Sequence, residues 1–549
     1  MIDAVLATAR DWLADDPDPD TVEELQGLLS AAEGGDDVAI AALRAAFAGP
    51  LEFGTAGLRG RIGPGPAQMN RVVVGQAAAG FAAWLTQQGL AGGKVLIGYD
   101  ARRKSDEFAR ETAEIFAGQG FEPVLTAGPI PTPVVAFGIR HLGCVAGVVV
   151  TASHNPPEDN GYKVYLGDGS QIIPPVDGEI SECIRKVTPE LLRAMEREGD
   201  YATIGAELLE AYVSRATTLV PGKAPRDVVW VHTAMHGVGA GPMRAVAAGA
   251  GFPAPIEVPE QSAPDPRFPT VSFPNPEEKG AIDLALALAQ ASGADVVIAN
   301  DPDADRCAVA APVDGVWRML TGDELGGLLG DYVIRLGRPG QFANSVVSST
   351  LLRDLALAAG RRHTTTLTGF KWIGRVPELA FGYEEAIGYC CDSAAVPDKD
   401  GLTAGLLVLR LVAELKAQGR TLGNRLDEIA ATHGLHATSQ LSVRVTELSE
   451  ITDAMASLRA DPPTHLLGRR VGVADLLTGT DDLPATDAVE FTGERIHVVA
   501  RPSGTEPKLK VYLEVVLTPE ESSDAAAARA RAAAELDELR SELATALGI

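Results

Sequence analysis

The sequence predicts an α/β protein of several domains, with a smaller α+β domain at its C-terminal end. Its 549 residues are too many for one hydrophobic core, because domains usually hold about 100 to 200 residues, which gives about three to five here. Short apolar runs alternate with helix-length segments through most of the chain, as in α/β layers. This alternation stops near Thr438, where antiparallel-looking strands and one long helix follow.

The alternation is already clear in the first part of the chain. Met1–Trp12 mixes apolar and charged residues and predicts an amphipathic helix. Strand-like runs follow at Lys94–Gly98, Pro123–Leu125 and Val145–Val150, separated by segments of helix length. We therefore place a first α/β domain, with a helical N-terminal extension, at residues 1–220.

Two more α/β units follow a break at Pro221–Pro225. The second unit, residues 221–330, contains strand-like runs at Val228–Val231 and Val296–Ile298. The third unit occupies residues 331–437. Its predicted elements are the strands Ser345–Val347 and Thr365–Leu367 and the helix Leu402–Leu415. No repeat of sequence relates the units, so the repetition concerns structure alone.

The last unit, residues 438–549, has a different texture. Predicted strands at Ser442–Val445, Ile496–Val499 and Lys510–Val516 precede an Ala/Glu/Arg-rich segment, Pro519–Leu547, that predicts a helix. Strands followed by a single helix indicate an α+β domain.

Composition excludes several classes of partner. The chain has 74 acidic and 47 basic residues and a formal net charge of −27, which repels nucleic acid and anionic lipid. Apolar runs stay below the ~18 residues of a membrane span, and the start lacks the basic head and apolar middle of a signal peptide. We expect a cytoplasmic protein with no nucleic-acid and no membrane partner. The five scattered cysteines predict reduced thiols and no zinc site.

The first candidate site is Thr151–Pro157, directly after the apolar run Val145–Val150. A hydroxyl in a Pro-rich turn just past a strand end is expected to be exposed and held stiffly. Ser153 is then a candidate nucleophile or phosphate carrier. An ordinary Asn/Pro turn is the alternative, while a serine hydrolase is disfavoured because G-x-S-x-G is absent here.

The second candidate site is Asn300–Arg306, which follows the run Val296–Ile298. Asp301, Asp303 and Asp305 alternate along it, and three such carboxylates repel one another unless a cation lies among them. All-oxygen ligands suit Mg²⁺. An EF-hand is excluded, because its Gly and Glu are missing at loop positions six and twelve. A phosphatase with an aspartyl nucleophile and an acidic surface turn are the alternatives.

Three further motifs are less specific. Arg501–Lys508 combines two hydroxyls, a Gly and an Arg between predicted strands, which suits a phosphate; a type II turn is the alternative. Glu384 and Glu385 are adjacent in a Gly-bounded loop. Their carboxylates could accept hydrogen bonds from sugar hydroxyls; a solvated turn is the alternative. Phe53–Arg61 is Gly-rich with two arginines; it is no dinucleotide fingerprint but is compatible with phosphate contact.

These five stretches, in this order, resemble the alpha-D-phosphohexomutase superfamily, the phosphoglucomutases and phosphomannomutases, over essentially the whole chain. Thr151–Pro156 resembles the family's phosphoserine loop, Asp301–Arg306 its magnesium loop, Glu384–Glu385 its sugar loop and Arg501–Thr505 its phosphate loop. The resemblance implies three similar α/β domains and a smaller fourth around a central cleft. Secondary matches are Phe53–Gly60, Thr368–Trp372 and Asp398–Gly401.

The resemblance also implies a mechanism. Phospho-Ser153 would transfer its phosphoryl group to a hexose monophosphate, and the resulting hexose 1,6-bisphosphate, intermediate and activator, would return its other phosphate to the serine. Lys163 would be the general acid or base, with Lys371 as the second candidate. The metal ligands implied for Mg²⁺ are Ser153, Asp301, Asp303 and Asp305.

The same resemblance assigns the remaining site residues. The catalytic set is Ser153, His154, Lys163, Lys371 and Arg59, and the substrate-binding set is Glu384, Glu385, Arg501, Ser503, Gly504 and Thr505. Ala386 stands where many phosphoglucomutases carry Ser, as in the branch that includes phosphopentomutases and broad-specificity phosphoglucomutases.

We predict a phosphomannomutase/phosphoglucomutase of mixed specificity. It would act on small-molecule sugar phosphates as a monomer or weak homo-oligomer. A phosphopentomutase is the alternative within the family. From other classes, a magnesium-dependent phosphatase is retained, and an inactive sugar-phosphate-binding protein is disfavoured because Ser153 and all three aspartates are present.

Overall fold

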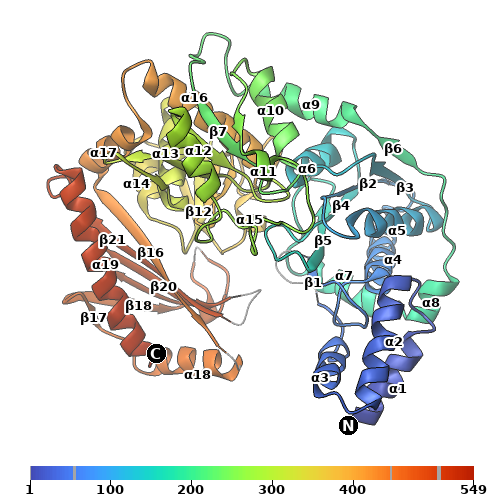
Figure 1. Cartoon of the computed structure of the whole chain (residues 1–549). Coiled ribbons are helices and arrows are strands. Elements are labelled where there is room, and N and C mark those ends of the chain that lie inside the picture. Colours follow the sequence, from blue (N-terminus) through green and yellow to red (C-terminus); the bar gives the residue numbers. More distant parts are fainter. Residues whose placement is uncertain (1, 53–56, 446–447, 482, 504–507, 549) are drawn as a thin grey trace.

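The computed structural model describes residues 2–52, 57–445, 448–481, 483–503 and 508–548. Four β-sheets follow one another along the chain, three of mixed strand direction and the last antiparallel (Figure 1). The predicted fold class is confirmed, with three α/β domains followed by a smaller C-terminal α+β domain. Within the described residues, no helix combines the length and apolarity needed to cross a membrane.

The first domain has a six-stranded sheet in the order β1-β5-β4-β2-β3-β6. Its strands are β1 (Leu58–Arg61), β2 (Lys94–Tyr99), β3 (Glu122–Thr126), β4 (Ala146–Val150), β5 (Asp159–Leu166) and β6 (Ala202–Ile204). Its helices are α1 (Ile2–Trp12), α2 (Pro19–Glu33), α3 (Asp37–Ala46), α4 (Arg71–Gln87), α5 (Ser105–Gly118), α6 (Thr132–His141), α7 (Val176–Arg185) and α8 (Pro189–Ala194). Strand β4 is wholly buried, as its unbroken apolar sequence predicts for a central parallel strand.

The second domain has the sheet order β11-β10-β9-β7-β8. Its strands are β7 (Trp230–Thr233), β8 (Ile256–Glu257), β9 (Val296–Ala299), β10 (Ala308–Val313) and β11 (Val316–Met319), and its helices are α9 (Ala206–Thr217), α10 (Ala240–Gly249), α11 (Pro259–Ser262) and α12 (Asp283–Ser292).

The third domain has the sheet order β13-β12-β14-β15. Its strands are β12 (Gln341–Ser345), β13 (His363–Thr366), β14 (Leu379–Glu384) and β15 (Gly388–Cys390), and its helices are α13 (Gly322–Arg335), α14 (Leu351–Ala358), α15 (Phe370–Ile373), α16 (Gly401–Lys416) and α17 (Leu422–His433). Two helices differ from the predicted domain bounds, since α9 lies within residues 1–220 and α13 begins within residues 221–330.

The fourth domain is an antiparallel sheet in the order β16-β21-β20-β19-β18-β17. Its strands are β16 (Leu435–Arg444), β17 (His465–Leu466), β18 (Arg469–Asp475), β19 (Val489–Gly493), β20 (Ile496–Pro502) and β21 (Lys508–Leu517). Its helices are α18 (Leu448–Ala460), the short 3-10 helix η1 (Leu476–Thr478) and α19 (Ala525–Leu547), and the apolar side of α19 shares a core with β20 and β21.

The first three sheets share a four-stranded unit, in which three parallel strands are followed by one antiparallel strand. The unit is β3-β2-β4-β5 in the first domain, β8-β7-β9-β10 in the second and β13-β12-β14-β15 in the third. In each unit the last parallel strand is joined to the antiparallel one by a short connection. The three connections are the Ser153 loop (residues 151–158), the Asp loop (residues 300–307) and the Glu loop (residues 384–388, including the strand ends).

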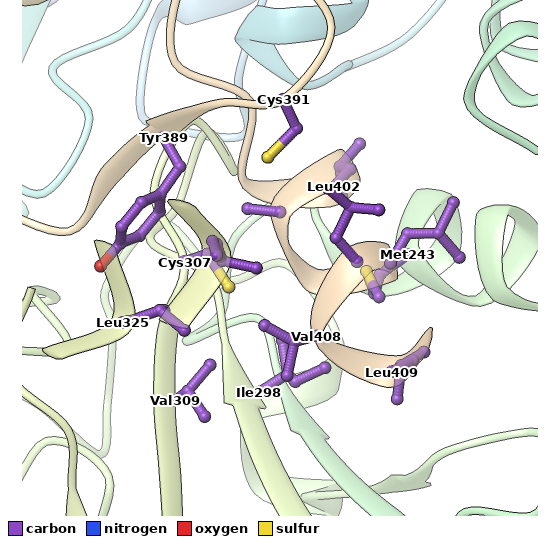
Figure 2. Packing of buried hydrophobic residues seen from close by; sticks show 14 of the residues in the cluster. Met243, Ile298, Cys307, Val309, Leu325, Tyr389, Cys391, Leu402, Val408 and Leu409 are labelled. Carbon is purple, nitrogen blue, oxygen red and sulfur yellow. The ribbon is translucent and has the colours of Figure 1, made fainter. Parts of the chain in front are cut away.

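A shared core fixes the second domain against the third. Helix α16 packs onto the strands of the second domain (Figure 2), and one hydrophobic cluster extends from the first domain into the third. Gly405 permits the close approach, since a Cβ there would lie 3.0 Å from the Met243 Cε and 3.3 Å from the Ile298 Cγ2. The N-terminus of α16 is thereby held beside the Asp loop.

Several predicted element boundaries were wrong. Strand β16 begins at Leu435 instead of Ser442, and β13 spans His363–Thr366 instead of Thr365–Leu367. Strand β12 ends at Ser345 instead of running over Ser345–Val347, because Val346 and Val347 pack into an apolar cluster with the fourth domain. Helix α19 begins at Ala525 instead of Pro519, because Asp524 caps it by accepting from the Ala527 N–H. All five cysteines are free thiols, as expected, and all are buried.

Candidate active site

Ser153 lies in the connection between β4 and β5 and faces the second domain. Its Oγ donates to the Asp301 Oδ2 at 2.6 Å and lies 3.2 Å from the His154 Nδ1. The residue is only 3% exposed, so the expectation of an exposed hydroxyl was wrong: the Asp loop covers it. Its φ of 51° is uncommon for a residue with a Cβ and marks a backbone held in place by its surroundings.

Arg102 holds the Ser153 loop in this shape. Its guanidinium donates to the backbone carbonyls of three loop residues and of the first residue of β5, and the side chain is almost completely buried. The four acceptors are the carbonyls of Ser153, Asn155, Pro156 and Asp159. The sequence analysis did not single out Arg102; its place just after β2, at the same edge of the sheet as the Ser153 loop, was the available signal.

The three aspartates of the Asp loop converge as predicted. One carboxylate oxygen of each of Asp301, Asp303 and Asp305 lies within 4.8 Å of the others, and all three residues are buried. Ala304 has a φ of 56°, a left-handed conformation that turns the chain between two of the aspartates. The loop therefore collects three carboxylates that would lie far apart along an extended strand.

Two oxygens of this cluster are unengaged. Lys163 Nζ donates to the Oδ2 of Asp303 at 2.7 Å and to the Oδ2 of Asp305 at 2.8 Å, and the Thr132 Oγ1 donates to the same Asp303 oxygen. The Oδ1 atoms of both aspartates are buried and have no hydrogen-bond partner within the described chain. Buried acceptors without partners are costly, and hard cations such as Mg²⁺ take oxygen ligands of this kind. The donor set therefore fits a divalent cation.

Charge and burial set the protonation of the neighbouring groups. Burial alone would disfavour the Lys163 ammonium, but Asp303 and Asp305 raise its pKa above the ordinary value. Burial, together with the cations Arg306 and Arg59, holds the pKa of His154 well below its usual range. Lys163 is therefore an ammonium at neutral pH and His154 a neutral imidazole.

The two carboxylates of the Glu loop face different partners. Glu385 accepts from the Ser345 Oγ at 3.1 Å and from the Ser348 Oγ at 3.3 Å. The Glu384 Oε1 instead lies 3.8 Å from the Lys399 Nζ. Both residues sit at the carboxyl end of β14 and are largely enclosed, so the solvated-turn interpretation of this motif is wrong.

Lys399 connects the Glu loop with the Asp loop. Its Nζ lies 3.4 Å from the Asp305 Oδ2 as well as 3.8 Å from Glu384, and the two loops also pair through an isolated bridge between Arg306 and Gly388. The sequence analysis quoted Lys399 only within a secondary match, because its partners are distant in sequence.

The remaining catalytic candidates divide into two groups. Arg59 donates from its Nη1 to the Asn155 Oδ1 at 2.9 Å, which places it beside the Ser153 loop. Lys371 stands apart on α15, with its Nζ 5.9 Å from the centre of the Trp372 ring and its pKa lowered by burial. Among the contacts of the described residues, none joins Lys371 to Ser153 or to the Asp loop.

Arg501 and Ser503, the phosphate-loop candidates within the described residues, lie at or just after the end of β20. Arg501 pairs with Lys510 across the two strands, and the Ser503 N–H donates to the Lys508 carbonyl at 2.8 Å. Gly504 and Thr505 lie outside the described residues. A cavity of about 270 Å³ separates this sheet from the Glu loop. Its lining includes Glu277, Glu385, Lys510 and Tyr512.

Comparison with known families accounts for the order of these loops. Models of the phosphoglucomutase/phosphomannomutase family match the chain in succession: alpha/beta/alpha domain I at residues 50–190, domain II at 210–314, domain III at 321–433 and the C-terminal domain at 441–532. The chain belongs to this family. It is an enzyme of the mutase class, in the alpha-D-phosphohexomutase superfamily.

Curated relatives of this enzyme carry several names. It is 46% identical to a "probable phosphomannomutase" of Haemophilus influenzae, over 81% of the chain and 93% of the relative. It is 37% identical to a "probable phosphoribomutase" of Schizosaccharomyces pombe, over 92% of both chains, and 36% identical to the phosphopentomutase of Homo sapiens, over 92% and 91%. The family is shared, while the sugar named differs from one relative to the next.

Solved structures agree with the fold of this enzyme. A putative phosphomannomutase from Thermus thermophilus has a TM-score of 0.68 at 29% identity and covers 89% of this chain and 99% of its own. A phosphoglucomutase (parafusin) from Paramecium in its open form has a TM-score of 0.70 at 17% identity, covering 91% and 96%; this second likeness concerns the fold alone.

Proposed function

We propose that this enzyme reversibly interconverts hexose 1-phosphates and hexose 6-phosphates, with glucose and mannose phosphates as substrates. The observation that carries the proposal is the contact between the Ser153 Oγ and the Asp301 Oδ2 at 2.6 Å. This contact places Ser153, the candidate phosphate carrier, against an acidic cluster in which two carboxylate oxygens have no hydrogen-bond partner within the described residues. A phosphatase that uses an aspartyl nucleophile would not require a serine at this position.

Ser153 carries the phosphoryl group between turnovers. In the first half-reaction, a bond forms between phosphorus and the oxygen of a sugar hydroxyl while the bond between phosphorus and the Ser153 Oγ breaks. One proton passes from the sugar hydroxyl to Ser153. The second half-reaction is the reverse step at the other end of the hexose 1,6-bisphosphate.

The acidic cluster prepares this transfer. Asp301, Asp303 and Asp305 would hold Mg²⁺, which when bound supplies a Lewis acid that offsets the charge of the transferring phosphoryl group. Lys163 keeps the Oδ2 atoms of two aspartates engaged, so that their Oδ1 atoms are directed elsewhere. We assign proton transfer to Lys163 rather than Lys371, since only Lys163 contacts the cluster within the described residues.

The other end of the substrate would be held by the fourth domain and the Glu loop. Glu384 would accept from sugar hydroxyls, and Arg501 with the Ser503–Thr505 segment would bind the phosphate that is not reacting, since an Arg fork matches phosphate oxygens. Both contacts survive a reversal of the bisphosphate. In either orientation its hydroxyls lie between the two phosphates and can reach Glu384, and one phosphate lies at the end that faces Arg501.

A phosphopentomutase is the second candidate. Ala386 in the Glu loop and the pentose-specific names of several relatives favour it. Coupled assays of kcat/KM on glucose, mannose and ribose 1-phosphates, primed with hexose 1,6-bisphosphate, decide between the two. We expect both hexoses to exceed ribose; a ribose value more than tenfold higher would replace the first proposal by the second.

Metal dependence and phosphate release complete the test. We expect activity to disappear in excess chelator and return with Mg²⁺, with little free phosphate formed. Full turnover in chelator would contradict the metal assignment, and stoichiometric phosphate release would identify a phosphatase.

A further inference from the structure

A short segment, residues 398–401, packs against the Asp loop at the start of α16. The Gly401 N–H donates to the Ala304 carbonyl at 3.2 Å. A Cβ at Gly401 would lie 2.2 Å from the Arg306 carbonyl oxygen, so only glycine permits this approach. Lys399 belongs to this segment and is therefore carried directly to the Asp loop.

The path of the Lys399 side chain is closely confined. A Cβ at Gly388 would lie 2.5 Å from the Lys399 Cδ. The aliphatic part of the Lys399 side chain therefore passes the Glu loop at Gly388, where the absence of a side chain leaves room for it. The ammonium ends between the Asp305 carboxylate at 3.4 Å and the Glu384 carboxylate at 3.8 Å, and the side chain is 13% exposed. A shift of the segment would weaken one of the two contacts.

Asp398 fixes the segment from the side of the first domain. Its Oδ1 accepts from the Lys399 N–H at 2.8 Å. Its Oδ2 accepts from the Tyr165 hydroxyl at 2.9 Å and from the Gln171 Nε2 at 2.8 Å. A carboxylate that is 1% exposed needs such donors, and here both side-chain donors come from another domain.

Strand β5 connects this arrangement with the Ser153 loop. The strand begins directly after that loop and carries Lys163 and Tyr165 two positions apart, hence on the same face. Lys163 reaches Asp303 and Asp305, while Tyr165 reaches Asp398. One strand thus contacts both the candidate metal ligands and the segment that carries Lys399.

We propose that Tyr165 and Gln171 are positioning residues, which act through Asp398 to hold Lys399 between the Asp loop and Glu384. The first domain then sets the relative placement of the acidic cluster and the Glu loop. This inference rests on the proposed function only for the substrate used in its kinetic test.

The position of Lys399 is measured independently of activity by reductive methylation. The Mg²⁺-loaded wild type, Tyr165→Phe and Tyr162→Phe are treated with formaldehyde and cyanoborohydride, and methylation of the Lys399 peptide is followed by mass spectrometry. Tyr162 is a matched control, because it is buried on the opposite face of the same strand. We expect methylation of Lys399 to be about tenfold faster in Tyr165→Phe, as for one lost charge-assisted hydrogen bond. Equal rates in all three proteins would overturn the proposal.

A double-mutant cycle tests whether Tyr165 acts through the lysine. On the best sugar phosphate, Tyr165→Phe is expected to lower kcat about tenfold, with Gln171→Leu as a second variant of the same kind. In a Lys399→Met background, Tyr165→Phe should change kcat less than about twofold, since coupled residues are not additive. Multiplicative effects would assign Tyr165 a purely structural role. Wild-type turnover of that sugar phosphate tests the proposed function separately.

Discussion

Replacement of Lys163 by Met tests how the acidic cluster is balanced. The Lys163 Nζ lies 2.7 Å from Asp303 and 2.8 Å from Asp305, and none of the three side chains is more than 3% exposed. Met keeps an unbranched apolar side chain but removes the charge and the donors. Two buried carboxylates therefore lose their shared partner.

The expected loss of stability follows from this burial. Removing one member of a buried ion pair costs about 3–5 kcal/mol, because the remaining charge is left uncompensated. Since a domain of this size shifts in Tm by about 2–4 °C per kcal/mol, the first unfolding transition should fall by roughly 6–20 °C in chelator. Mg²⁺ should restore part of the loss, because an ion that binds the folded state stabilises it. Turnover should disappear.

Differential scanning calorimetry with chelator and with Mg²⁺ provides the measurement. Lys186→Met is the control, since Lys186 is an exposed lysine of the same domain, where substitutions usually stay within about 0.5 kcal/mol. A Lys163→Met protein with an unchanged transition in chelator and wild-type turnover would refute the view that this ammonium balances the aspartates.

Two further predictions concern the fourth domain and the third. Arg501→Ala should lower kcat/KM about tenfold to a hundredfold, as for the loss of one charge-assisted contact, and this variant should release hexose 1,6-bisphosphate into solution. The kcat/KM of Arg501→Lys should fall between the values of the alanine variant and the wild type. An Arg501→Ala protein with unchanged kcat/KM for every sugar phosphate would contradict the assignment. Burial raises the pKa of Asp323 to about 7, although the Ser349 N–H opposes it. A carboxyl whose pKa rises on folding contributes stability that is fully present below its ordinary pKa of 3.8 and is lost progressively as pH rises through about 7. The free energy of unfolding by urea of Asp323→Asn, relative to that of the wild type, should therefore be higher near pH 8.5 than near pH 5.5, and equal differences at both pH values would contradict this.

Sequence reasoning predicted the strands whose residues are apolar throughout. Strands β4 and β9 carry unbroken apolar sequence and are wholly buried, so their pattern alone identifies them. Strand β12 is equally buried but contains Gln341, Asn344 and Ser345. The strand was therefore predicted too late in the chain, at Ser345–Val347. Val346 and Val347 are apolar because they pack against the fourth domain, and nothing in the neighbouring sequence distinguishes such residues from those of a strand.

The same distinction holds for the candidate site. The Asp triad is predictable because its three carboxylates alternate within five residues of chain. Arg102 and Lys399 were not identified as site residues, because their contacts join segments that only the tertiary fold brings together. The enclosure of Ser153 was missed for the same reason, since the covering loop belongs to another domain.

The central claim is that Ser153 carries a transferable phosphoryl group, and a label-transfer experiment tests it most directly. The enzyme is incubated with hexose 1,6-bisphosphate labelled in both phosphates, digested, and examined by mass spectrometry for the added mass of roughly 80 Da. Label is predicted on the Ser153 peptide, absent from Ser153→Ala, and transferred completely to hexose phosphate when unlabelled monophosphate is added. Label on Asp301, Asp303 or Asp305, or its appearance as free phosphate in place of sugar phosphate, would contradict the account.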